Sequence, residues 1–182
     1  MDECHVVFGL VGRIDPVKNH AGFLVAAAQL VESCPAARFV VAGYDPAGRR
    51  PALQQQAVTL GIADRMIWQD GTQAMPAVYN GLDWLVSASH SEGSPNVLGE
   101  AMACGVPGIT TDTGDAAWLL AEGGYVVPVG DTAALAAALR QAYATGGAAL
   151  ASPRARVEQV FSAGNLLTNT ESALRAVQPK GN

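Results

Sequence analysis

The segment SHSEGSPNVLGEAMACGVP (residues 89–107) combines two carboxylates with the features of a helix N-terminus that can bind phosphate. Ser94 is expected to cap the helix and Pro95 to occupy its first position. Three backbone amides would then be free, those of Asn96, Val97 and Leu98. Free amides and the helix dipole together attract a phosphate group. Gly93, which has no side chain, would let the ligand approach the backbone closely.

Two glutamates flank this cradle. Glu92 precedes the helix, and Glu100 lies one turn beyond Asn96 on the same helical face. A carboxylate does not bind phosphate, but it accepts hydrogen bonds from hydroxyls. We therefore predict contacts to hydroxyls at the two ends of one ligand, such as a sugar and a ribose. The alternative is that Glu92 is a solvated loop residue and Glu100 an exposed helix residue.

A second segment, VGRIDPVKNH, follows the first predicted strand and supplies cations. Gly12, Arg13 and Lys18 are its candidates for ligand binding. Two cations that converge here could bind a diphosphate and offset the charge that develops as it leaves. Alternatively, the cations are ordinary surface charges, and Asp15–Pro16 is only a turn or the start of a helix.

Both segments need a scaffold that brings them together. Apolar runs typical of strands cover residues 5–12, 37–43, 65–69, 83–89 and 107–111, with 124–127 as a sixth candidate. Helices are predicted over residues 19–33, 52–60, 75–80, 95–104, 131–144 and 154–177. This alternation predicts an α/β fold, a Rossmann-like and mostly parallel sheet with helices on both faces. Ligands bind at the carboxyl ends of such strands. The loops expected there are residues 12–19, 43–50, 69–73, 89–95 and 110–115.

Length and composition narrow the classes of protein. The 182 residues are predicted to form a single domain, 1–182, and 49% hydrophobic with 15% charged residues argues against disorder. A formal charge of −5 argues against a nucleic-acid partner. Cys4, Cys34 and Cys104 are widely spaced and are predicted to be reduced thiols. No apolar run reaches the ~20 residues of a membrane span and no signal peptide is recognisable, so we expect a cytoplasmic location.

The two motifs together resemble family-4 (group 1) retaining glycosyltransferases. The shared features are GRIDPVK before a helix, and SEGSPNVLGEAMACGVP with two glutamates separated by seven residues. The resemblance covers residues 6–144 and implies the C-terminal half of a GT-B fold. It also implies binding of a nucleoside diphosphate sugar, and transfer of a hexosyl group to an acceptor hydroxyl with retention. No metal and no other cofactor is expected.

The resemblance also implies a role for each candidate residue. Arg13 and Lys18 would hold the donor diphosphate and assist its departure, and Glu92 would contact the donor sugar. These three are the catalytic candidates. Glu100 would contact the ribose, and the backbone of residues 93–98 would surround the sugar and phosphates. The predicted donor-binding set is Gly12, Arg13, Lys18, Glu92, Gly93, Ser94, Pro95, Asn96, Val97, Leu98 and Glu100.

Two residues limit what the resemblance implies about the sugar and about a catalytic base. The family often has an aromatic residue where Ser94 stands, so the resemblance does not identify the sugar. In this class the departing phosphate oxygen helps to deprotonate the acceptor, so no dedicated protein base is implied. His90 is therefore predicted to pack or to form hydrogen bonds rather than to act as a base.

The family's acceptor site lies mainly on an N-terminal domain that residues 1–182 do not encode. The chain is therefore expected to be inactive alone and to need an acceptor domain or a partner subunit, through which it could associate with a membrane. Residues 162–177 are expected to dock onto another domain or to form a homodimer.

Three other functions share this fold class. A nicotinamide-dependent oxidoreductase is disfavoured because no GxGxxG motif follows the first strand. A non-catalytic nucleotide-binding or interaction module and a GT-B nucleotide-sugar isomerase domain stay open as alternatives.

Overall fold

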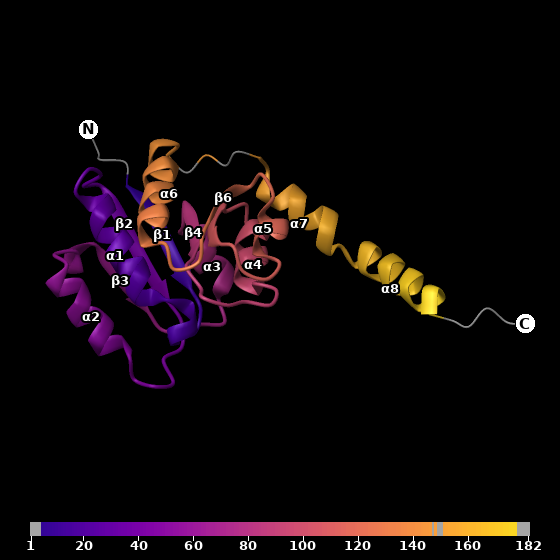
Figure 1. Cartoon of the computed structure of the whole chain (residues 1–182), viewed down its shortest axis with the longest axis horizontal. Coiled ribbons are helices and arrows are strands. Elements are labelled where there is room, and N and C mark those ends of the chain that lie inside the picture. The colour runs from indigo at the N-terminus through magenta and orange to yellow at the C-terminus, as the bar shows by residue number, and fades with distance from the viewer. Residues whose placement is uncertain (1–4, 147, 149–150, 178–182) are drawn as a thin grey trace, which may run out of the picture.

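Six strands form one sheet in the order β3-β2-β1-β4-β5-β6, in a computed structural model that describes residues 5–146, 148 and 151–177 (Figure 1). The strands are β1 (Val6–Val11), β2 (Ala37–Ala42), β3 (Met66–Gln69), β4 (Trp84–Ser87), β5 (Gly108–Thr111) and β6 (Gly124–Val127). All neighbouring strands pair in parallel. The predicted Rossmann-like parallel sheet is confirmed, with every strand within two residues of its expected bounds. Cys4 lies outside the described residues.

The described part of the chain contains eight α-helices. They are α1 (His20–Val31), α2 (Arg50–Thr59), α3 (Met75–Asn80), α4 (Asn96–Ala103), α5 (Ala116–Leu120), α6 (Thr132–Ala144), α7 (Pro153–Phe161) and α8 (Ala163–Val177). Two 3-10 helices are η1 (Pro16–Lys18) and η2 (Ala63–Arg65). The sequence did not predict α5, because five residues are too few to show helical periodicity. The segment predicted to be helical over 154–177 is helical, but it forms two helices, because an extended Ser162 separates α7 from α8.

Both faces of the sheet are buried. Along β1, Phe8 and Leu10 join a core cluster with α1, α2 and α6, whereas Val11 joins a second cluster with α3, α4 and α5. Successive residues of a strand point to opposite faces, so a strand covered on both sides reads as a continuous apolar run. This is why the strands were recognisable in the sequence.

The last two helices differ in how they are held. On α7, the Arg156 guanidinium donates a hydrogen bond of 2.8 Å to the Trp118 carbonyl and lies 5.1 Å from the centre of the Trp118 ring. Helix α8 extends away from the sheet (Figure 1), with Leu167 and Leu174 more than half exposed. Within the described residues, no helix is both long and apolar enough to cross a membrane.

The carboxyl ends of β1 and β2 approach each other very closely. The amide of Gly12 donates to the carbonyl of Ala42 at 2.8 Å. A Cβ atom on Gly43 would lie 1.8 Å from the Gly12 carbonyl oxygen, far inside any permitted contact. Gly43 therefore lets the two loops that follow these strands start side by side.

This approach predicts that Gly43→Ala lowers the free energy of unfolding by about 2 kcal/mol or more, because the backbone at Gly12 must move. Urea unfolding followed by circular dichroism measures the change. Gly164→Ala is the control, because a Cβ atom there meets no neighbour within 4 Å, and α8 should tolerate it or gain stability. Equal stability of the Gly43→Ala variant and the wild type would contradict the prediction.

Candidate functional site

The sheet reverses its direction of winding between β1 and β4. These two strands are hydrogen-bonded neighbours, yet the helix after β1 packs on one face and the helix after β4 packs on the other. The carboxyl ends of β1 and β4 are thus the point where the strand order reverses, and in open α/β sheets the ligand-binding crevice lies at such a point. The two motifs predicted to bind the donor form the loops that follow these two strands.

An ion pair joins the loops across the crevice. The Lys18 Nζ atom lies 2.5 Å from the Glu92 Oε1 atom, which also accepts a hydrogen bond of 2.6 Å from the Ser89 hydroxyl. The side chains of Lys18 and Glu92 are only 21% and 12% exposed. Charge-assisted hydrogen bonds of this kind are stronger than neutral ones. The structure thus brings together two residues that the sequence places 74 positions apart. It adds Ser89, which belongs to the first motif but was not among the predicted site residues.

Hydrogen bonds to the backbone reinforce this arrangement. The amide of His90 donates to the Val17 carbonyl at 2.7 Å, while the His90 side chain is exposed. The buried Thr111 hydroxyl donates to the Ser89 carbonyl at 2.7 Å. The amide of Asp115 donates to the Gly93 carbonyl at 2.9 Å. These hydrogen bonds therefore join the loops 12–19, 89–95 and 110–115 to one another.

The N-terminus of α4 differs by one residue from the prediction. Pro95 is the N-cap, in an extended conformation, and Ser94 makes no capping hydrogen bond. Because the helix begins at Asn96, the amide of Leu98 donates to the Pro95 carbonyl at 3.0 Å and is not free, contrary to expectation. The amides of Asn96 and Val97 are left without a partner in the helix, as the geometry of a first turn requires.

Glu100 accepts a hydrogen bond from a residue that the sequence did not indicate. The Tyr79 hydroxyl, on α3, donates a hydrogen bond of 2.6 Å to the Glu100 Oε2 atom. Burial, and then this hydrogen bond, raise the pKa of Tyr79 above its ordinary value, so the phenol stays protonated as the donor. Tyr79 is almost fully buried whereas Glu100 is exposed. A tyrosine 21 positions before its partner gives no signal in the sequence.

Arg13 and Lys18 bind different carboxylates. An Arg13 guanidinium nitrogen lies 3.6 Å from an Asp15 carboxylate oxygen, and the Arg13 side chain is 60% exposed. The residue before it, Gly12, has a φ of 145° that favours glycine. The two cations thus share one loop, but Arg13 pairs within that loop, whereas Lys18 pairs across the crevice with Glu92.

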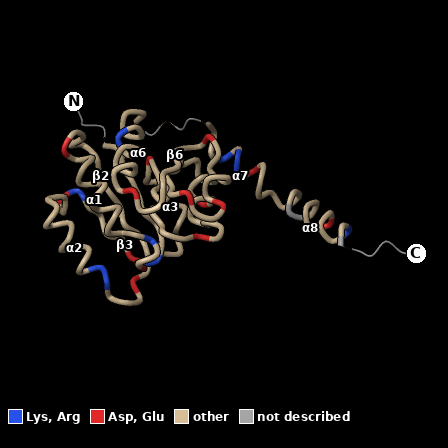
Figure 2. Tube along the Cα trace, in the orientation of Figure 1, with Lys and Arg blue, Asp and Glu red and all other residues tan. Residues whose placement is uncertain are grey.

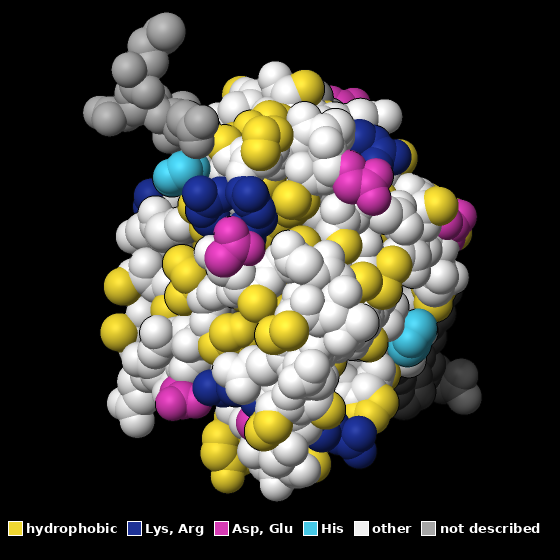
Figure 3. Space-filling view, turned by 90° about the vertical axis from the view of Figure 1, so that its left-hand side faces the viewer, with side chains coloured by type: hydrophobic (Ala, Val, Ile, Leu, Met, Phe, Trp, Pro, Cys, Tyr) yellow, Lys and Arg dark blue, Asp and Glu magenta, His cyan; other side chains and the backbone are white. Residues whose placement is uncertain are grey.

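The charges of the molecule are mixed. Basic and acidic segments lie close together in the loops at the carboxyl edge of the sheet (Figure 2). On the face shown in Figure 3, both signs occur in small separate groups rather than as one continuous basic surface. Among the described residues, no three His, Cys, Asp or Glu side chains gather as a metal site would require.

His20, at the start of α1, is a residue whose environment the sequence did not define. Its side chain is buried at 3% exposure, and its Nε2 atom has no hydrogen-bond partner. Burial lowers the pKa of His20 to about 4, against the opposing effect of a hydrogen bond with the Asp15 backbone. The imidazole is therefore neutral at physiological pH.

Comparison with known proteins shows which protein family the sequence matches. The model of the family described as glycosyl transferases group 1 matches residues 5–145. A D-inositol 3-phosphate glycosyltransferase of Segniliparus rotundus is 34% identical over 118 residues, which make up 63% of this chain and 26% of that protein. This chain thus spans about a quarter of that relative's length.

Solved structures share the fold. Anabaena Alr3699/HepE in complex with UDP superposes with a TM-score of 0.84 at 22% identity, over 96% of this chain and 50% of that one. The C-terminal domain of the Francisella tularensis group 1 glycosyl transferase LpcC, crystallised as a separate domain, gives a TM-score of 0.76 at 24% identity. It covers 87% of each chain.

The low pKa of His20 predicts a pH-dependent stability. Between pH 6.5 and about 4 the unfolded chain binds a proton that the folded protein does not. The free energy of unfolding therefore falls as the pH is lowered through this window, by about 3 kcal/mol in full, and His20 contributes no pH dependence above it. Urea unfolding at pH 7 and pH 4.5 should show a larger loss for the wild type than for His20→Gln. An NMR titration in which this imidazole protonates near pH 6.5 would contradict the prediction.

Proposed function

The chain belongs to the group 1 glycosyl transferase family, and we propose that it is the donor-binding domain of a retaining GT-B glycosyltransferase that transfers a hexosyl group. The observation that carries the proposal is the Lys18–Glu92 ion pair in the crevice between β1 and β4, beside the N-terminus of α4. A cation, a carboxylate and free helix amides in one crevice match the phosphates and hydroxyls of a nucleoside diphosphate sugar.

Binding of the donor exchanges partners within this ion pair. The diphosphate takes the Lys18 ammonium from Glu92, because a phosphate carries more charge and more acceptor oxygens than one carboxylate. The amides of Asn96 and Val97 add hydrogen bonds at the helix N-terminus. Glu92, still oriented by the Ser89 hydroxyl, is then able to accept hydrogen bonds from the hydroxyls of the sugar.

The ribose lies against α4 in this proposal. Glu100 accepts hydrogen bonds from its hydroxyls. Because the Tyr79 hydroxyl already occupies Oε2, the remaining lone pairs of this carboxylate are oriented before the ligand arrives. Such preorganisation lowers the entropy that binding would otherwise cost.

Arg13 and Lys18 assist the chemical step. As the bond between the sugar and the diphosphate breaks, negative charge grows on the leaving oxygen, and the two cations stabilise it. The departing phosphate oxygen accepts the proton of the acceptor hydroxyl, so the proposal needs no protein base and no metal ion.

The acceptor is proposed to bind a second domain, because this chain spans about a quarter of a curated relative and half of HepE. The HepE structure, with the same fold, contains UDP, which supports a nucleoside diphosphate as the ligand here. By itself the chain is expected to bind the donor without transferring the sugar.

Calorimetric titration with UDP, GDP and ADP tests the proposal. One of the three should bind saturably, and Lys18→Met and Glu100→Ala should each weaken it by about tenfold or more, since a hydrogen bond to a charged group contributes about 1.5–3 kcal/mol. Arg140→Ala is the control, because this cation is exposed on α6 and should leave the affinity unchanged.

Two results would change the conclusion. If the folded chain binds none of the three nucleotides, or if Lys18→Met and Arg140→Ala behave alike, the donor site is misplaced. If a UDP-sugar binds but releases no UDP even when an acceptor domain is added, the chain is a non-catalytic binding module. Conversion of the sugar without any acceptor would instead indicate an isomerase.

A further inference from the structure

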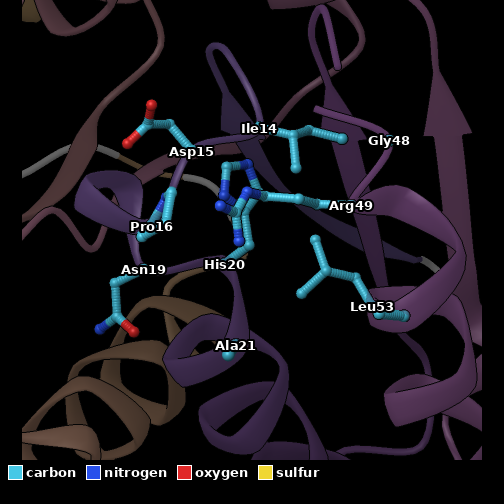
Figure 4. A pocket seen from close by; sticks show the side chains of 10 residues that line it. Ile14, Asp15, Pro16, Asn19, His20, Ala21, Gly48, Arg49 and Leu53 are labelled. Atoms are coloured by element: carbon cyan, nitrogen blue, oxygen red, sulfur yellow. The ribbon is translucent and has the colours of Figure 1, made fainter. Parts of the chain in front are cut away.

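A second pocket lies on the other side of the β1–α1 loop, outside the proposed donor site. Its volume is about 480 Å³, within the range of small-molecule sites. It opens between the start of α1 and the start of α2 (Figure 4). The lining residues are Ile14, Asp15, Pro16, Asn19, His20, Ala21, Gly48, Arg49, Ala52 and Leu53. Neither Lys18 nor Glu92 is among them.

The inner wall of this pocket carries a buried hydrogen-bond acceptor. The His20 imidazole has one nitrogen, Nε2, without a partner. Because hydrogen bonding with the Asp15 backbone raises the pKa of the ring and Nε2 is unpaired, we assign the N–H group to Nδ1. A neutral imidazole that donates through Nδ1 has a lone pair on Nε2. Leaving such a buried acceptor unpaired costs about 1–3 kcal/mol. This atom is therefore suited to a ligand that presents an O–H or N–H group.

The rim of the pocket carries a cation. Arg49 is the N-cap of α2 and is exposed, and its backbone amide donates to the Asp45 carboxylate at 2.9 Å. Figure 4 shows its side chain extending over the pocket toward the imidazole of His20. A guanidinium binds carboxylate and phosphate groups through paired hydrogen bonds.

The other lining residues determine which chemical group can occupy the middle of the pocket. Ile14, Ala21 and Leu53 contribute apolar surface to the lining of the pocket. Asp15 and Asn19 also line the pocket, but the Asp15 carboxylate is paired with Arg13 and the Asn19 side chain caps α1. An aromatic ring or a branched hydrocarbon, which buries apolar area, therefore suits these walls better than a free sugar.

We propose that this pocket binds a small organic anion with three parts. A hydroxyl or N–H group donates to His20 Nε2, an apolar body contacts Ile14 and Leu53, and a carboxylate or phosphate meets Arg49. The site is separate from the donor site, although both are built on the loop between β1 and α1.

The probe that tests this proposal is 4-hydroxybenzoate, which carries all three groups. Isothermal titration and ¹⁵N–¹H NMR of the folded chain should show saturable binding, with shifts at α1, at α2 and at the His20 imidazole. Benzoate and 4-methoxybenzoate, which lack the donor, should each bind at least ~5-fold more weakly, a difference of about 1 kcal/mol. Phenol should bind without any contribution from Arg49.

Variants separate the parts of the site. Arg49→Gln should weaken 4-hydroxybenzoate by about fivefold and leave phenol unchanged. Ala52→Phe, which fills the pocket from the exposed start of α2, should abolish binding of the probe but leave nucleotide binding intact. Ala133→Phe, at an exposed position on α6, is the matched control.

Three outcomes would overturn the proposal. The first is no binding of 4-hydroxybenzoate by the folded wild type. The second is equal binding of benzoate and 4-hydroxybenzoate, which would leave His20 Nε2 without a role. The third is probe binding that Ala52→Phe and Ala133→Phe affect equally, which would place the ligand elsewhere. A failed nucleotide titration bears only on the donor site, because none of these outcomes depends on it.

Discussion

The reversal of strand order at β1 is the constraint on which the rest of this structure depends. A right-handed connection after β1 carries the chain to one face of the sheet, and the connection after β4 carries it to the other. No helix can then fill the space between the two loops at the carboxyl edge. Both motifs lie in these loops, so the architecture converts two separate segments into one crevice.

Polar groups in that crevice hold each other in place. Lys18 and Glu92 are mostly buried, and an unpaired charge at either position would be costly, so each residue requires the other. Ser89 and Thr111 fix the carboxylate-bearing loop through hydrogen bonds to neighbouring groups. The side chains of the proposed donor site are thus oriented before any ligand arrives, and an anion would have only to replace one carboxylate at one ammonium group.

The β1–α1 loop has two sides of different chemistry. Lys18 lies toward β4 and the proposed donor site, whereas His20 lies beneath the pocket beside α2. The Lys18 ammonium is charged and paired with the Glu92 carboxylate, whereas burial keeps the His20 ring neutral. The same short segment thereby presents a cation to one crevice and a hydrogen-bond acceptor to another. Gly43 permits this arrangement, because no side chain separates the loop from β2.

The sequence by itself determined the parallel α/β sheet, because buried strands read as apolar runs. It also located the two motifs that are proposed to bind the donor, because Glu92 and Glu100 flank one helix start. The start of α4 lies one residue later than the sequence predicted, and this shift changes which amides are free. Only the tertiary structure decided the partners, such as Tyr79 for Glu100 and Lys18 for Glu92. Local periodicity records burial and helix ends, whereas contacts between distant segments depend on strand order and loop geometry, which no short pattern encodes.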